Sequence, residues 1–226
     1  MDIERIKLFK DRKEAGIKLA ERLGDYKSLE NILVLALPRG GVPVAFEVAK
    51  SLVAPLDIFI TRKLRFPDNL ELAVGALAEN GEIFLNKELI NYCTDTYLEE
   101  EISYQKEEIK RRQILYRGGK ELPSFIGNVV ILIDDGIATG ATMIATIHAL
   151  RVSRITKLIV AVPVAPPKIV EELTKLADEL IVIHTPSPFF AVGEHYLDFR
   201  QVTDEEVKKY LEEAKTIYKS HEEAKT

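Results

Sequence analysis

The chain has 226 residues, a formal net charge of -5 and a composition that is 46% hydrophobic and 30% charged. This is enough apolar material for a folded core, and the charge is too evenly mixed for a disordered tail. The acidic excess argues against a general binder of nucleic acid or membrane surfaces. The one cysteine, Cys93, excludes an internal disulfide and a metal cluster with several cysteine ligands.

The N-terminal residues give no targeting signal, because residues 1–10 mix charged with apolar side chains and contain no hydrophobic region. Apolar runs such as 129–133 and 158–162 are as long as strands and too short to span a bilayer. We therefore expect a cytoplasmic protein that has no membrane partner. The length and the absence of a linker predict one domain over 1–226.

The first half of the chain is predicted from apolar spacing and from turn residues such as Gly24 and the Asn80-Gly81 pair. The expected elements are a helix over 2–23, a strand over 32–37, a helix over 42–52, a strand over 56–61, a polar basic loop over 62–69, and a hairpin of 72–78 with 82–85.

The second half alternates between helical and strand patterns. The expected elements are a charged helix over 97–116, a strand over 129–133, a helix over 142–150, a strand over 157–162, a helix over 166–177, a strand over 180–184, an irregular aromatic segment over 185–201, and a last helix that begins at a capping box at 203–206. Such alternation predicts an α/β fold with a doubly wound, mostly parallel sheet.

The most informative segment is Val129–Thr142, in which an apolar strand ends in Asp134 and Asp135. The loop that follows, 136–142, contains two glycines and two threonines and opens a helix. Backbone N–H groups at a helix N-terminus suit a phosphate, and the threonine hydroxyls add donors. The two carboxylates suit sugar hydroxyls or Mg²⁺. Together they predict a ribose 5-phosphate ligand.

Other interpretations of this segment are weaker. A strand that ends in two acids occurs in nucleotide hydrolases, but the chain contains no GxxxxGK[ST] loop. It also occurs in the acidic pocket of receiver domains, which lack a loop like Ala138–Thr142 directly after the acids. A purely structural strand would rarely bury two adjacent carboxylates.

The segment resembles the 5-phosphoribosyl-1-pyrophosphate (PRPP) motif of type I phosphoribosyltransferases, and weaker similarity extends over about 32–201. The resemblance implies a Rossmann-like core at about 28–184, a hood at about 185–202, and helical additions at both ends. It also implies that Asp134 and Asp135 are catalytic and bind Mg²⁺. The PRPP-binding residues that it implies are Gly136, Ile137, Ala138, Thr139, Gly140, Ala141 and Thr142.

A second matching position is the turn Pro38-Arg39-Gly40-Gly41. Gly40 and Gly41 allow close approach of a ligand, and Arg39 can bind phosphate oxygens with two hydrogen bonds. In the family this turn is the pyrophosphate loop and often holds a non-proline cis peptide, so Arg39 is implied to be catalytic. The alternative is an ordinary turn that starts a helix.

The family also has a mobile loop after the second strand, which corresponds here to a flexible hairpin loop over 62–81. Lys63 is implied to be catalytic and Arg62 to bind PRPP, both facing pyrophosphate. Glu71 is a candidate base for the incoming acceptor. The alternative is a basic, exposed loop with no ligand.

The hood resembles that of 6-oxopurine enzymes, with Phe190 and Val192 as acceptor-binding residues and Asp198 as a ligand for a second Mg²⁺. The alternative is that these aromatic residues only pack in the core. Ala138 stands where those enzymes carry an acid, and Ile183 or His184 where they carry a lysine. The loop looks more like that of adenine enzymes, and the whole chain is similar to a poorly assigned subgroup of phosphoribosyltransferase-like proteins.

The resemblance implies an Mg²⁺-dependent enzyme that transfers 5-phosphoribosyl from PRPP to a nitrogenous base, with a purine expected, in nucleotide salvage. It also implies a homodimer, and no nucleic-acid partner is expected. The first alternative is a non-enzymatic regulator that binds PRPP on the same fold. The second is a pentose-phosphate or nucleotide hydrolase that uses the same phosphate loop.

Overall fold

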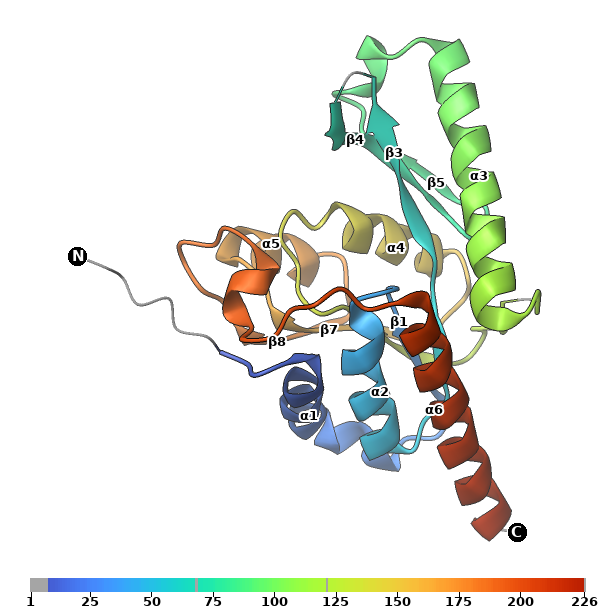
Figure 1. The fold of residues 1–226 in the computed structure, drawn as a ribbon, viewed down its shortest axis with the longest axis vertical. Helices are drawn as coiled ribbons and strands as arrows, with labels where there is room; N and C mark the ends of the chain where they lie inside the picture. The colour runs from blue at the N-terminus through green and yellow to red at the C-terminus, as the bar shows by residue number, and fades with distance from the viewer. Residues whose placement is uncertain (1–7, 68, 121, 226) are drawn as a thin grey trace. The chain divides into compact units, whose positions relative to one another are not determined.

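A computed structural model describes residues 8–67, 69–120 and 122–225, with the side chains of 70, 71 and 225 outside the description. The candidate base Glu71 therefore lies outside the described side chains. The chain forms two compact units (Figure 1). The first consists of Met1–Ile58, Gly127–Thr139 and Ile155–Thr226, and the second of Phe59–Ile126 and Gly140–Arg154.

The first unit is built on a five-stranded sheet in the order β2-β1-β6-β7-β8, and all of its pairings are parallel. This confirms the predicted α/β class. Its strands read as continuous apolar runs because the sheet is buried on both faces, and all residues of the first strand are buried. The strands are β1 (Ile32–Ala36), β2 (Leu56–Ile58), β6 (Val129–Ile133), β7 (Lys157–Val164) and β8 (Glu179–His184).

The helices of this unit lie on both faces of the sheet (Figure 1). Helices α1 (Arg12–Arg22) and α2 (Gly41–Leu52) pack against each other on one face, and α5 (Pro167–Thr174) lies on the other. The connections β1–β2 and β7–β8 cross the sheet in opposite directions, so right-handed crossovers place their helices on opposite faces. The last helix, α6 (Asp204–Lys225), packs against α2.

The switch point of the sheet lies between β1 and β6. The chain leaves β1 toward β2 on one side, whereas β6 is followed in the sheet by β7 on the other side. Ala36 pairs with Ile133, and the Leu37 N–H donates to the Ile133 carbonyl at 2.9 Å, so both strands end level. Ligands of open α/β sheets bind outside the carboxyl ends of the strands at such a point.

The N-terminal segment differs from the prediction of a helix over 2–23. Residues 1–7 lie outside the described part, and α1 begins only at Arg12, where Asp11 caps it by accepting a hydrogen bond from the Glu14 N–H. Residues 8–10 are not helical because they pair with the hood. The Phe9 N–H donates to the carbonyl of His195 at 3.0 Å, and the side chain of Phe9 is buried.

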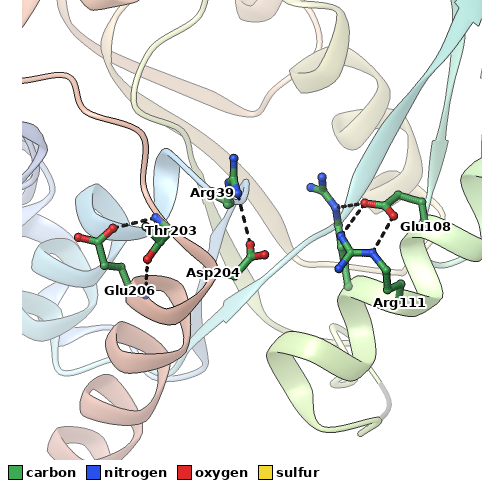
Figure 2. A network of polar contacts seen from close by, with 7 residues as sticks. Arg39, Glu108, Arg111, Thr203, Asp204 and Glu206 are labelled. Atoms are coloured by element: carbon green, nitrogen blue, oxygen red, sulfur yellow. Dashed lines mark hydrogen bonds and ion pairs between the residues drawn. The ribbon is translucent and has the colours of Figure 1, made fainter.

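The start of α6 confirms the predicted capping box (Figure 2). The Glu206 N–H donates to the Thr203 hydroxyl, and the Thr203 N–H donates to the Glu206 carboxylate at 2.7 Å. The described residues also form 3₁₀ helices at Gly24–Ser28, Ile90–Tyr92 and, inside the hood, Val192–His195.

The second unit contains an antiparallel sheet in the order β3-β4-β5 and two helices. The turn at Asn80-Gly81 confirms the predicted hairpin. The predicted polar loop over 62–69 is wrong for most of its length, because Leu64 is buried and the segment pairs with β4 as a strand with bulges. The elements are β3 (Thr61–Phe66), β4 (Asn69–Ala78), β5 (Ile83–Leu85), α3 (Asp95–Arg117) and α4 (Ala141–Arg151).

A buried ion pair fixes α3 to the hairpin within the second unit. The Glu79 carboxylate receives two hydrogen bonds from the Arg117 guanidinium, at 2.5 and 2.8 Å. It also accepts from the Ile60 N–H at 2.8 Å and from the Gln113 amide at 3.1 Å. The Glu79 side chain is 0% exposed and that of Arg117 is 6% exposed, so neither partner can turn to water in the folded state.

We predict that Arg117→Met destabilises the protein by about 3 kcal/mol, because it leaves a buried carboxylate without its cation. Arg111→Met is the matched control on the same helix, since Arg111 is 57% exposed and forms an ion pair with Glu108 (Figure 2). Its cost should stay below about 1 kcal/mol. Urea unfolding of both variants measures the difference, and equal losses would contradict the assigned role of the buried pair.

Candidate functional site

The turn after β1 packs closely against the two acids that follow β6. The Pro38–Arg39 peptide is cis, and the helix α2 begins directly after Gly40. A Cβ placed on Gly40 would lie 2.1 Å from Oδ2 of Asp135, and one on Gly41 would lie 2.8 Å from the carbonyl oxygen of Ile133. Only glycine fits this closely, so the structure brings the predicted Gly40-Gly41 turn and Asp135 together.

Arg39 lies at the same sheet edge with its side chain 31% exposed. Its guanidinium is 3.6 Å from the carboxylate of Asp204 in the first turn of α6 (Figure 2). Sequence reasoning identified Arg39 but not this partner. An anion that binds Arg39 therefore meets a cation that already has one carboxylate beside it.

The two predicted acids have different surroundings. Asp135 is buried, its Oδ2 lies 2.7 Å from Nε of Arg12, and its carbonyl oxygen accepts a hydrogen bond from the Tyr196 hydroxyl at 2.5 Å. Asp134 is half-buried, and its Oδ1 accepts a hydrogen bond from the Asp135 N–H at 2.8 Å. The carboxylate of Asp135 is thus held by the protein itself.

The electrostatics of the pair follow from burial. Burial raises the pKa of Asp134, and the neighbouring carboxylate of Asp135 raises it further. Burial also raises the pKa of Asp135, while the Arg12 guanidinium opposes that effect. Two carboxylates share one guanidinium here, so the site favours a further cation or hydroxyl donors. The carboxylate oxygens of Asp134 and Asp135 are donors of the type that Mg²⁺ prefers, together with phosphate oxygens.

The predicted phosphate loop divides at the boundary between the units. In the first unit, Gly136 and Ile137 are buried, and the Ile137 N–H donates to the Val164 carbonyl at 2.9 Å, whereas Ala138 and Thr139 are exposed. In the second unit, Gly140 has φ +76° and precedes the helix α4, whose first residues are Ala141 and Thr142. The loop therefore opens a helix N-terminus, as predicted.

The hood packs against the start of this loop. A Cβ on Gly136 would lie 2.5 Å from Cγ1 of Val192, so the structure brings this predicted acceptor residue to the PRPP motif. The ring of Phe190 is 66% exposed.

Asp198 is bound by the Arg200 guanidinium, at 2.8 Å between Nη2 and Oδ2. Within the described ranges, no three His, Cys, Asp or Glu side chains gather as a metal-binding group, and the assignment of Asp198 to a second Mg²⁺ stays a prediction.

The neighbouring cations Arg62 and Lys63 of β3 (Thr61–Phe66) lie on opposite faces of the strand, because successive side chains alternate. The Nε of Arg62 donates to Oε1 of the buried Gln105 at 2.9 Å, and burial lowers the pKa of Arg62. Lys63 is exposed. The roles of both cations at pyrophosphate stay predictions.

Sequence reasoning missed Arg12 and Tyr196. Arg12 lies in a charged N-terminal stretch where nothing distinguishes it from Lys10 or Lys13. Tyr196 was one aromatic residue among several in the hood. Their roles follow from contacts between residues more than 60 positions apart in the chain, which local spacing does not reveal.

We predict that Asp134→Asn stabilises the protein at pH 7. A raised pKa means that the folded state holds the proton after the unfolded chain has lost it, so Asp134 costs stability as pH rises above its ordinary value of 3.8. The amide removes this cost and keeps an oxygen for the Asp135 N–H. Thermal unfolding should show a higher Tm at pH 7 and no gain near pH 3.5.

The control for this comparison is Asp25→Asn, which changes an exposed carboxylate of the same unit. A lower Tm for Asp134→Asn at pH 7, or the same gain at both pH values, would contradict the electrostatic account.

Within the part of the chain that the structure describes, no helix is both long enough and apolar enough to cross a membrane.

Comparison with known proteins confirms the resemblance. A crystal structure of TT1426 from Thermus thermophilus is 43% identical with a TM-score of 0.79, covering 91% of this chain and 98% of that one. "Putative phosphoribosyl transferase Rv0571c" from Mycobacterium tuberculosis H37Rv is 42% identical over 211 residues, which is 92% of this chain and 47% of the relative. "Putative phosphoribosyl transferase MT0597" from strain CDC 1551 gives the same values.

The chain thus spans about half the length of the curated relatives that it matches. The family match covers residues 3–198, a range that includes the Gly40-Gly41 turn, both acids and the hood up to Asp198. The chain belongs to the phosphoribosyl transferase domain family.

Proposed function

We propose that the protein transfers the 5-phosphoribosyl group of PRPP to a ring nitrogen of a nucleobase and releases pyrophosphate. The observation that carries this proposal is the arrangement at the switch point of the sheet. A Gly-Gly turn after β1 contacts the carboxylate of Asp135, and a phosphate-type loop that opens a helix follows the acids. PRPP is a ribose with a phosphate at C5 and a pyrophosphate at C1, and these are the chemical groups that the turn, the acids and the loop are suited to bind.

Each part has a role in binding PRPP. Residues 139–142 supply backbone N–H groups and threonine hydroxyls for the 5-phosphate. The acids Asp134 and Asp135 supply the negative charge beneath the ribose hydroxyls. Arg39 binds pyrophosphate oxygens in competition with Asp204, and Gly40 and Gly41 let the ligand approach the backbone. Lys63, an exposed residue of β3, is a further cation that the resemblance assigns to pyrophosphate.

The reaction breaks the bond between C1 and the pyrophosphate oxygen and forms a bond between C1 and the ring nitrogen. The proton of that nitrogen passes to a general base, for which Glu71 is the candidate from the sequence. As the leaving group departs, positive charge grows on the ribose and negative charge on pyrophosphate. The acids stabilise the first charge and Arg39 the second, a role that the resemblance also gives to Lys63. Asp134, with the negative charge of Asp135 beside it, would hold Mg²⁺, which would supply further charge neutralisation on the leaving group.

The proposed acceptor is a purine, in a salvage reaction. We assign Phe190, an exposed residue of the hood, to stacking on the base, and Val192, which packs against Gly136 at the start of the PRPP loop, to acceptor binding. The proposed protein is a single phosphoribosyltransferase domain that forms a homodimer, as the resemblance implies. Its acidic net charge favours no nucleic-acid partner.

We predict that the wild type binds Mg·PRPP in isothermal titration calorimetry and that Asp134→Asn loses at least about 90% of the affinity, because a neutral amide no longer attracts the cation or the hydroxyl donors. Since this variant should be more stable than the wild type at pH 7, unfolding cannot explain the loss. Asp25→Asn is again the control. Absence of binding by the wild type would overturn the proposal.

Turnover is measured as pyrophosphate release with a panel of adenine, hypoxanthine, guanine and pyrimidine bases. Release with a purine is the predicted result. Binding of PRPP without release on any base would instead favour a non-enzymatic regulator, and release of inorganic phosphate would indicate a hydrolase.

A further inference from the structure

Arg12 connects three parts of the first unit that are distant in sequence. It is the first residue of α1, and its side chain is 11% exposed. Its Nε donates to Oδ2 of Asp135 at 2.7 Å, and its Nη1 donates to the carbonyl oxygen of Arg200 in the hood at 2.7 Å. The guanidinium also lies over the ring of Phe199, 3.9 Å from its centre.

The hood residues that Arg12 contacts are themselves fixed in place. A Cβ on Gly193 would lie 2.7 Å from Cδ1 of Phe199, so the ring packs closely against the hood backbone. The ring of Phe199 also lies 5.0 Å from that of Tyr196, whose hydroxyl binds the Asp135 carbonyl. Arg12 and Tyr196 therefore connect the hood to the side chain and to the backbone of the same acid.

The residues just before Arg12 strengthen this connection. The Leu197 N–H donates to the Phe9 carbonyl at 2.9 Å, and the Asp198 N–H donates to the Lys10 carbonyl at 2.8 Å. The N-terminal segment thus pairs with the hood and then delivers Arg12 to Asp135. These two amides report directly on whether the segment stays attached.

We propose that Arg12 is a positioning residue that fixes the carboxylate of Asp135 and holds the hood against the PRPP motif. The guanidinium lies on one side of this carboxylate and the Gly40 backbone on another. The protein therefore sets the orientation of the carboxylate before a ligand arrives. Asp134 is then the acid left to meet the ribose hydroxyls or the metal. This division of roles rests on the proposed function, whereas the connection to the hood does not.

Two substitutions of Arg12 distinguish the contribution of its charge from that of its planar guanidinium. Arg12→Met keeps much of the apolar stem and removes the charge and the donors. Arg12→Lys keeps the charge but cannot bind a carboxylate, a carbonyl and a ring face at once, because its ammonium lacks the planar fork of arginine. Arg22→Met is the matched control, since it removes an exposed guanidinium from the last turn of the same helix.

The first measurement needs no ligand. Hydrogen exchange in the wild-type chain and its variants follows the amides of Leu197 and Asp198. Arg12→Met should speed their exchange at least about tenfold, Arg12→Lys less, and Arg22→Met not at all. In an Asp135→Asn background the effect of Arg12→Met should be much smaller, because its main partner has already changed.

Unchanged exchange in Arg12→Met, or an equal effect in both backgrounds, would overturn the connection through Asp135. A general loss of structure is recognised by faster exchange in β1 and β6, which the proposal expects to remain slow.

The second measurement compares Arg12→Met in the wild-type and Asp135→Asn backgrounds again, now by titration with Mg·PRPP. Arg12→Met should weaken binding about tenfold, as expected for a lost charged hydrogen bond, and should add little to Asp135→Asn. Independent effects of the two substitutions would contradict action through Asp135. Failure of the wild type to bind would overturn the proposed function, and hydrogen exchange alone would then decide the role of Arg12.

Discussion

The contact on which the first unit depends is the ion pair between Arg12 and Asp135. A buried carboxylate needs a partner, and Asp135 obtains one from a helix that begins more than a hundred residues earlier in the chain. Because the same guanidinium contacts the hood, the need to neutralise one acid also fixes the N-terminal segment and the hood at the carboxyl edge of the sheet. Gly40 completes the arrangement, since any larger residue would displace the carboxylate.

The surroundings of Asp134 differ from those of Asp135. Asp134 has no guanidinium of its own within hydrogen-bond distance among the described residues, and burial beside Asp135 raises its pKa. A group that lowers stability at neutral pH is typical of a binding site, where the charge is kept for a ligand. The two acids are adjacent in sequence and equivalent in a motif, yet among the described residues only Asp135 has a guanidinium within hydrogen-bond distance.

Most of the core fold could be predicted from the sequence because buried parallel strands are continuous apolar runs, as in Val129–Ile133, and because glycines and caps mark the ends of helices. The N-terminus could not, since nothing local shows that Phe9 pairs with the hood instead of extending a helix. The strand character of Arg62–Phe66 was hidden for a related reason: its polar residues form a strand only because β4 lies beside them.

For the site, the turn, the acids and the loop could be predicted because each is a short segment with a fixed place after a strand. Arg12, Tyr196 and the Asp204 partner of Arg39 depend on tertiary contacts and have no local pattern. The sequence therefore identified the groups that would touch a ligand better than the groups that hold them in position.

The most direct test is a crystal structure of the chain with Mg²⁺ and PRPP. We predict the ribose hydroxyls or the metal on Asp134, the 5-phosphate at residues 139–142, and Nε of Arg12 still within hydrogen-bond distance of Asp135. A ligand bound directly to the carboxylate of Asp135, with Arg12 displaced from it, would contradict the account.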